Sequence, residues 1–185
     1  MKDIASFIAL NPAKPPVLTR AIHVAVMGVA GCGKSALAER IAAQLQLPLI
    51  EGDAFHPDGN IAKMQRGLAL TDADRADWLN TLSAELGKHA SGAVLTCSAL
   101  RASYRNTLRH ATPLLRFVHS SIPQTLALQR VAGRPGHIFP PSLVASQFAA
   151  LEDPAGEPGV LVLDGALPLD ALAALATRWL AQPLA

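Results

Sequence analysis

The segment that most constrains this chain is a glycine-rich loop at residues 28–35, with the sequence Gly-Val-Ala-Gly-Cys-Gly-Lys-Ser. It matches the pattern G-x-x-x-x-G-K-S, in which backbone N–H groups surround the phosphates of a nucleotide. A short apolar run, Ile22–Met27, precedes the loop, and residues 36–45 have helical spacing of their apolar side chains. A strand, a loop and a helix in this order are the context that a phosphate loop requires.

The loop chemistry predicts a bound nucleoside triphosphate with Mg²⁺. Lys34 would reach the β- and γ-phosphates, and the Ser35 hydroxyl would hold the metal ion. A glycine turn that merely caps a helix is the alternative, but it would require neither of these two residues. The residues expected to contact the nucleotide are Gly28, Val29, Ala30, Gly31, Cys32, Gly33, Lys34 and Ser35.

Composition favours one compact domain. Half of the 185 residues are hydrophobic and 16% are charged, which suits a chain that buries a large core. The net charge of +2, without a basic cluster interleaved with aromatic residues, argues against a nucleic-acid partner. The two cysteines, Cys32 and Cys97, form neither a metal-ligand pair nor a disulfide framework, so we expect a reducing cytoplasmic compartment.

The first twenty residues differ from the rest of the chain. Residues 4–10 are apolar but too few to cross a bilayer, and no cleavage pattern of a signal peptide follows them. Residues 11–16 contain three prolines and interrupt regular structure. We expect a loose N-terminal extension at 1–20, a single domain at 21–185 and no membrane association.

Beyond the loop, strand and helix patterns alternate, which predicts a parallel sheet covered by helices on both faces. A helix from Thr71 would place Trp78, Leu82 and Leu86 on one face. A last helix from about residue 168 would place Leu172, Leu175 and Trp179 on one side. The other expected strands are 47–50, 93–97, 114–119 and 160–163, and the other helices are 102–110 and 124–131. The expected fold is a three-layer α/β phosphate-loop NTPase with about five strands.

Several classes of protein are disfavoured. The expected strand 93–97 ends in Ser98-Ala99-Leu100, without the acidic residue that motor-type ATPases and GTPases place on Mg²⁺ there. No Asn-Lys-x-Asp sequence that would recognise guanine is present. The six histidines form no helical i,i+4 pair and have no cysteine partner, so a metal site built from protein ligands is not expected. A small-molecule kinase remains.

Three further segments resemble the gluconokinase family. They run in the family's order and, with the phosphate loop, cover the chain from about residue 21 to its C-terminal region. The first segment comprises Gly52-Asp53-Ala54-Phe55-His56-Pro57, Asn60, Lys63-Met64, Gly67, Asp72-x-Asp74-Arg75 and Trp78-Leu79. The second is Cys97-Ser98-Ala99-Leu100 with Tyr104-Arg105, and the third is Gly136-His137-x-Phe139 with Ser146-Gln147-Phe148 and Leu151-Glu152.

The resemblance implies a fold like that of shikimate and adenylate kinases, with a mobile lid, and ATP-dependent phosphorylation of D-gluconate to 6-phospho-D-gluconate. It also implies a homodimer. A kinase for another small sugar acid or for shikimate is the first alternative. A nucleotide-binding regulator without turnover is the second.

Within these segments, side-chain chemistry suggests specific roles. Asp53, after a short strand, could orient the attacking hydroxyl, accept its proton or hold water on Mg²⁺, although Gly-Asp pairs are also common in solvated turns. His56 could bind substrate hydroxyls or simply pack. A substrate carboxylate suits an arginine, for which Arg105 is the first candidate, ahead of Arg75 and Arg101. The expected substrate-binding set is Asp53, His56, Arg75, Arg105 and His137.

Residues 130–141, rich in glycine, proline and arginine, are expected to form the lid. Arg130 and Arg134 would fold over the phosphates and, with Lys34 and Asp53, form the catalytic set. Pro135 stands where the family commonly has a basic residue, so one lid charge is missing. Cys32, at a helix N-terminus beside a lysine, is expected to be an accessible and reactive thiol, and Cys97 a slower one.

Overall fold

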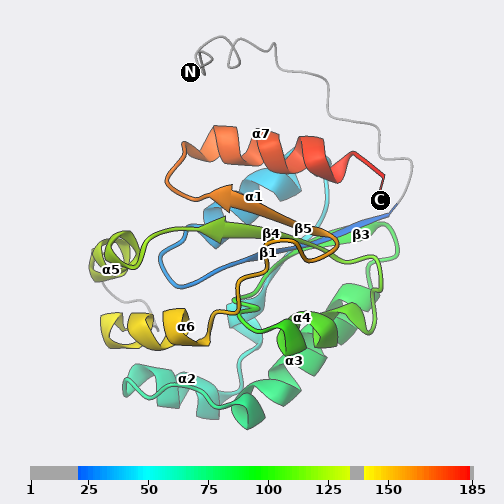
Figure 1. Cartoon of the computed structure of the whole chain (residues 1–185). Coiled ribbons are helices and arrows are strands. Elements are labelled where there is room, and N and C mark those ends of the chain that lie inside the picture. The colour runs from blue at the N-terminus through cyan, green and yellow to red at the C-terminus, as the bar shows by residue number, and fades with distance from the viewer. Residues whose placement is uncertain (1–20, 134–139, 184–185) are drawn as a thin grey trace.

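The computed structural model of the protein describes residues 21–133 and 140–183. Five parallel strands form one sheet in the order β2-β3-β1-β4-β5, which confirms the predicted central parallel sheet (Figure 1). The strands are β1 (Ile22–Met27), β2 (Leu49–Glu51), β3 (Gly92–Thr96), β4 (Arg116–Ser121) and β5 (Val160–Asp164).

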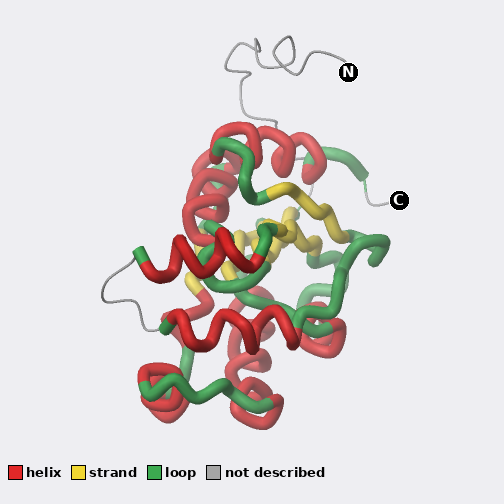
Figure 2. The backbone as a smooth tube through the Cα atoms, turned by 60° about the vertical axis from the view of Figure 1, so that its left-hand side comes forward, coloured by secondary structure: helices red, strands yellow, loops and turns green. Residues whose placement is uncertain are grey.

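Helices cover both faces of this sheet and complete the three-layer α/β fold (Figures 1 and 2). α1 and α7 pack on one face and α3 and α4 on the other, whereas α2, α5 and α6 lie toward the carboxyl ends of the strands. The helices are α1 (Lys34–Leu45), α2 (Asp58–Gln65), α3 (Asp72–Gly87), α4 (Ala102–Arg109), α5 (Gln124–Ala132), α6 (Val144–Ala150) and α7 (Leu169–Leu180). Two short 3₁₀ turns, η2 (Gly52–Phe55) and η3 (Pro141–Leu143), complete the list of described elements.

Alternation along the buried strands divides the core into two layers. On β1, Val24 and Val26 face the cluster with α1 and α7, whereas Ala25 and Met27 face the cluster with α3 and α4. All four are fully buried, as expected for a parallel sheet covered on both sides. The continuous apolar run that marked β1 in the sequence therefore supplies both faces of the sheet.

The predicted α3 is confirmed, including its start. Thr71 is the N-cap and accepts a hydrogen bond from the backbone N–H of Asp74, while the Asp74 carboxylate accepts one from the backbone N–H of Thr71. This reciprocal capping satisfies N–H groups that the helix itself cannot pair. Trp78, Leu82 and Leu86 are all buried in one cluster, so the expected common face is also correct.

The predicted face of α7 is wrong in one position. Leu172, Ala173, Ala176 and Leu180 are buried against α1 and the sheet, but Leu175 is 40% exposed. The buried set follows an i, i+1, i+4, i+8 pattern, in which small alanines allow α7 to approach α1 closely. Trp179 packs only partly against the cluster.

The order in which the chain forms the strands indicates where on the sheet a ligand would bind. The chain passes from β1 to β2 and β3 on one side and then crosses to β4 and β5 on the other. Ligands of open α/β sheets bind at the carboxyl ends of strands where this change of direction occurs, here beside the end of β1.

No helix within 21–133 and 140–183 is long and apolar enough to cross a membrane. The expected extension at 1–20 lies outside the described residues.

Candidate active site

The loop at residues 28–35 joins β1 to α1 and is open on its inner side. Gly33 is the N-cap of α1 with φ of 86°, a left-handed conformation that favours glycine, and a Cβ there would meet no atom within 4 Å. Among the described residues, no side chain caps this helix. Its first N–H groups are therefore available to an anion, and the positive end of the helix dipole adds to the attraction.

Side chains behind the loop bind its carbonyl groups. The Ser120 hydroxyl donates to the carbonyl oxygen of Cys32 at 2.8 Å. The Arg130 guanidinium lies 3.4 Å from the carbonyl oxygen of Gly31 and 3.3 Å from that of Gly165. Between these two carbonyl groups, the N–H of Cys32 donates to the carbonyl oxygen of Val29 at 3.2 Å, so this part of the loop is held by hydrogen bonds from within and from behind. Arg130 thus belongs to the last turn of α5 and contacts the loop from outside its hollow.

Two adjoining hollows lie at this edge. One, the phosphate hollow, is lined by the loop residues 30, 31 and 33–35 together with Asp53 and Val131. The other, the outer hollow, extends from the loop toward α3 and α6. Ala30, Lys34 and Asp53 line both. A group bound on the loop and a molecule bound in the outer hollow would therefore meet beside these three residues.

A carboxylate that the sequence prediction overlooked lies beside Ser35. The Ser35 hydroxyl is 3.4 Å from Oε2 of Glu51, and the Thr96 hydroxyl donates to the same oxygen at 2.8 Å. Oε1 of Glu51 is buried and has no partner among the described residues. Glu51 ends β2 and is paired in register with Thr96 at the end of β3. The neighbouring strand therefore places a carboxylate beside Ser35, although β3 itself is followed by no acidic residue.

This arrangement suits Mg²⁺ carried by a nucleotide. The described residues contain no group of three or more histidine, cysteine or acidic side chains that could hold a metal ion by themselves. Mg²⁺ with nucleotides is held by few protein oxygens, phosphate oxygens and water. The Ser35 hydroxyl and the unpartnered Glu51 oxygen fit such a shell, the latter directly or through water.

Asp53 and His56 approach the outer hollow from η2. Trp78 fixes this turn, since its indole N–H donates to the carbonyl oxygen of Gly52 at 2.8 Å. A Cβ at Gly52 would lie 2.1 Å from the carbonyl oxygen of Thr96, so only glycine fits. The His56 ring stacks on Trp78 with centroids 4.1 Å apart. Burial lowers the pKa of His56, against an opposing effect of Asp53, which favours a neutral ring able to donate and accept hydrogen bonds.

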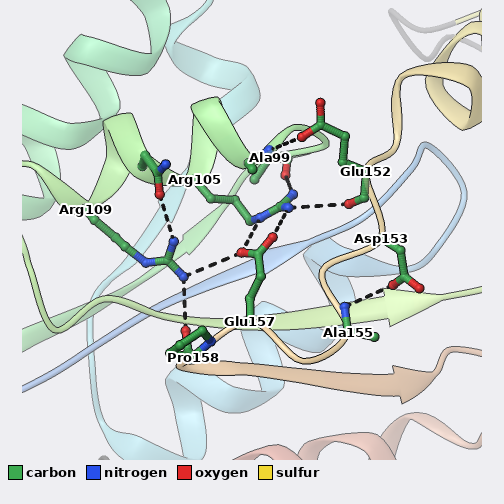
Figure 3. A network of polar contacts seen from close by, with 10 residues as sticks. Ala99, Arg105, Arg109, Glu152, Asp153, Ala155, Glu157 and Pro158 are labelled. Atoms are coloured by element: carbon green, nitrogen blue, oxygen red, sulfur yellow. Dashed lines mark hydrogen bonds and ion pairs between the residues drawn. The ribbon is translucent and has the colours of Figure 1, made fainter.

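The structure places at the outer hollow a different arginine from the one that the sequence favoured as ligand of a substrate carboxylate. Arg105 is fully buried and paired with Glu157, and it also donates to the carbonyl oxygen of Ala99 at 2.9 Å (Figure 3). It does not line the outer hollow. Arg101 pairs with Asp72 at 2.6 Å and does not line it either. Arg75 does, so the weaker sequence candidate is the one that the fold places there.

The hydrogen bonds of Arg105 instead stabilise the backbone next to Ser98, which lines the outer hollow. Ala99 has φ of 43°, which is strained for alanine, and its carbonyl group is held by Arg105. The preceding Ser98 lines the outer hollow and accepts a hydrogen bond from the N–H of Gly28 at 3.3 Å. The motif around Ser98 thus joins the hollow to the phosphate loop, and Arg105 stabilises it from below.

The predictions for the lid and for the two cysteines agree with the structure only in part. Residues 130–132 of the expected lid belong to α5, and Arg134 and His137 lie outside the described residues. Cys32 is 2% exposed and packs with apolar side chains, so the expectation of an accessible thiol is wrong. Burial raises the pKa of Cys97 to about 12, consistent with the expected slow thiol. Met64, Leu143 and Gln147 line the outer hollow, and the sequence prediction assigned none of them to it.

Three known proteins that are similar to this chain along most of its length are named gluconokinases. A gluconokinase of Gluconobacter oxydans (strain 621H) is 44% identical over 143 residues, covering 76% of this chain and 80% of that protein. The thermoresistant gluconokinase of Escherichia coli (strain K12) is 39% identical over 157 residues, covering 82% and 90%. The crystal structure of a gluconokinase from Sinorhizobium meliloti 1021 superposes with a TM-score of 0.80 at 42% identity, covering 86% and 91%.

No protein-family model matches the sequence. The curated relatives nevertheless align along most of their own length as well as most of this chain. The solved gluconokinase structure likewise covers 86% of this chain and 91% of its own. From this similarity in sequence and fold, the chain belongs to the gluconokinase family.

Proposed function

We propose that the protein transfers the γ-phosphoryl group of ATP to D-gluconate, forming 6-phospho-D-gluconate and ADP. The observation that carries the proposal is the junction of the two hollows at Ala30, Lys34 and Asp53. It would bring a phosphate on the loop next to a hydroxyl of a molecule in the outer hollow. Membership of the gluconokinase family supports D-gluconate as that molecule.

In the proposed reaction, a gluconate hydroxyl oxygen forms a bond to the γ-phosphorus while the bond from that phosphorus to the ADP oxygen breaks. Asp53 accepts the hydroxyl proton. Lys34 and the loop N–H groups stabilise the charge that spreads over the phosphoryl oxygens. Bound Mg²⁺, held by Ser35 and Glu51, would neutralise charge on the β- and γ-phosphates. Arg134 completes the proposed catalytic set, whereas Arg130 supports the phosphate loop through the carbonyl oxygen of Gly31.

The outer hollow offers complementary groups to a sugar acid. Arg75 would bind the carboxylate, because a planar guanidinium matches its two oxygens. Its Nη1 donates to the carbonyl oxygen of Leu70 at 2.5 Å, which fixes the side chain against the start of α3. Neutral His56 and Ser98 would bind hydroxyl groups, and His137 would approach from the lid.

The test is a panel of acceptors with purified protein and Mg-ATP, following ADP release. D-gluconate should stimulate release far more than shikimate, glucose or AMP. Lys34→Ala should abolish this stimulation, whereas Lys88→Ala, which alters a surface lysine paired with Glu85, should not. Equal stimulation by shikimate would contradict the proposal. Binding of Mg-ATP with no ADP release for any acceptor would indicate the regulator instead.

A cytoplasmic homodimer with one kinase domain at 21–185 completes the proposal. Both cysteines are free, as in a reducing compartment, and the family resemblance supports the dimer. Light scattering coupled to size-exclusion chromatography tests the assembly. A mass of one 19.4-kDa chain at micromolar concentration would contradict it.

A further inference from the structure

Gln147 on α6 connects two parts of the chain that are 117 residues apart. Its side-chain oxygen accepts a hydrogen bond from the backbone N–H of Ala30 at 2.6 Å. Ala30 is one of the three residues shared by the two hollows. Gln147 itself lines the outer hollow but not the phosphate hollow. It therefore lies on the acceptor side of the junction where the transfer is proposed.

Packing fixes the position of this side chain. Val144, three residues earlier on α6, is fully buried in a cluster with Val29 and Ala30 of the phosphate loop, and Phe148 packs against that cluster. Leu143, which directly precedes α6, is buried in another cluster with Met64 and Leu70. A glutamine on a helix that is packed in this way, and already hydrogen-bonded to Ala30, loses little further rotamer freedom when it binds a ligand, which favours positioning.

The bond to Ala30 also fixes the orientation of the amide. A backbone N–H can only donate, so the Gln147 atom facing it must be the carbonyl oxygen. The amide nitrogen then takes the opposite place. Among the described residues it donates to no partner, although the amide group carries two N–H donors. An uncharged donor beside Asp53, which is an acceptor, and Arg75, which is a cation, suits a hydroxyl oxygen.

We propose that Gln147 is a substrate-positioning residue whose amide N–H group donates to a hydroxyl oxygen of the sugar acid while its carbonyl oxygen holds Ala30 of the phosphate loop. This role rests on the proposed gluconate kinase activity. It gives the enzyme a link between occupancy of the acceptor side and the backbone that surrounds the transferred phosphoryl group. A molecule of similar size lacking the contacted hydroxyl would leave the donor unpaired and bind less well.

The experiment compares wild type with Gln147→Leu, which keeps the size of the side chain and removes its hydrogen bonds. Gln129→Leu, an exposed position on α5, is the control. The kcat/KM for D-gluconate should fall about ten-fold or more in Gln147→Leu, mainly through a higher KM for gluconate. The affinity for Mg-ATP, measured without acceptor, should stay within about three-fold, and Gln129→Leu should match wild type.

Mono-deoxy derivatives of D-gluconate separate a direct contact from a structural one. For the derivative that lacks the contacted hydroxyl, Gln147→Leu should lower kcat/KM clearly less than it does for gluconate, because the hydroxyl contact is already absent and only the bond to Ala30 is lost. An equal loss in Gln147→Leu for gluconate and for every deoxy derivative would overturn the role, as would an equal loss of Mg-ATP affinity. A wild type without turnover of gluconate would overturn the proposed function itself, whereas an active wild type with a fully active Gln147→Leu overturns the role of Gln147 alone.

Discussion

At the residue scale, the site separates two carboxylates that are two positions apart. Glu51 lies against the Ser35 and Thr96 hydroxyls, whereas Asp53 lines both hollows. The 3₁₀ turn η2 begins between them and turns the second carboxylate away from the first. In the proposed reaction, the first would serve the metal ion of the nucleotide and the second the acceptor hydroxyl.

Asp53→Asn is expected to reduce kcat by about 100-fold or more, because an amide cannot accept the hydroxyl proton. Mg-ATP should still bind, since the loop N–H groups supply its main contacts. Turnover by ADP release and nucleotide affinity by calorimetry measure the two effects. Asp77→Asn, at an exposed position of α3, is the control. Near-normal turnover in Asp53→Asn would show that the catalytic carboxylate lies elsewhere.

Substitutions of Arg75 and Arg105 should affect different properties, the first substrate binding and the second stability. Arg75→Met is expected to raise the KM for gluconate at least ten-fold with little change in stability. Arg105→Met removes one member of a buried ion pair and should lower the free energy of unfolding by about 3 kcal/mol. Chemical denaturation and steady-state kinetics distinguish these outcomes. Arg40→Met, in an exposed pair with Asp170 at 3.4 Å, should cost less than about 1 kcal/mol. A stable Arg105→Met with a raised KM would restore Arg105 as the carboxylate ligand.

At the scale of elements, short connections between helices define the outer hollow. α3 carries Arg75 and Trp78, and its capped start is joined to α4 because Asp72 binds Arg101 at 2.6 Å and the Tyr104 hydroxyl at 2.5 Å. α2 is joined to the same start, since Lys63 pairs with Asp74. The ion pair and hydrogen bonds hold the pKa of Asp74 well below its usual range. The N-terminal turn of α3 is therefore a common attachment point for the walls of the hollow.

Thr71→Ala is expected to destabilise the protein by about 1 kcal/mol, because the N–H of Asp74 loses its capping acceptor. Thr81→Ala, the same change in the middle of α3 at an exposed position, is the matched control and should have a smaller effect. Urea denaturation measures both. If the two variants lose equal stability, the capping hydrogen bond contributes nothing beyond the general effect of removing a threonine.

At the scale of the whole molecule, burial of histidines within the fold makes stability depend on pH. His119 lies within β4 at 3% exposure, and its Nδ1 is buried without a partner among the described residues. Burial lowers its pKa from the ordinary 6.5, against the effect of Asp153, and Arg105 lowers it further. His56 is shifted in the same direction. Below pH 6.5 the unfolded chain therefore binds more protons than the folded chain does.

The stability contribution of these histidines should be fully present above about pH 6.5 and be lost progressively as the pH falls below it. His119→Gln should flatten this dependence, because glutamine does not titrate. Unfolding free energies between pH 5 and 8 provide the measurement, and identical slopes in His119→Gln and wild type would contradict it.

The sequence by itself determined the parts that depend on local order: the phosphate loop between a strand and a helix, the alternating strands and helices, and the start of α3 at Thr71. Spacing and capping act over a few residues, so they are visible without tertiary structure. Helices α2 and α6 escaped prediction because they are short and largely carry polar or small residues. The wrong position on α7 has a similar cause, since apolar residues occupy more than one side of that helix.

Only the tertiary structure decided which side chains face the site. Arg105 is removed from it by Glu157, 52 residues later, whereas Gln147 is brought to Ala30 across 117 residues. Glu51 reaches the expected metal position because β2 lies beside β3 in register. Such contacts depend on which strands are neighbours and on which charges find a buried partner. The free energy of these pairings depends on surroundings formed by the whole fold, so a local pattern in the sequence does not reveal them.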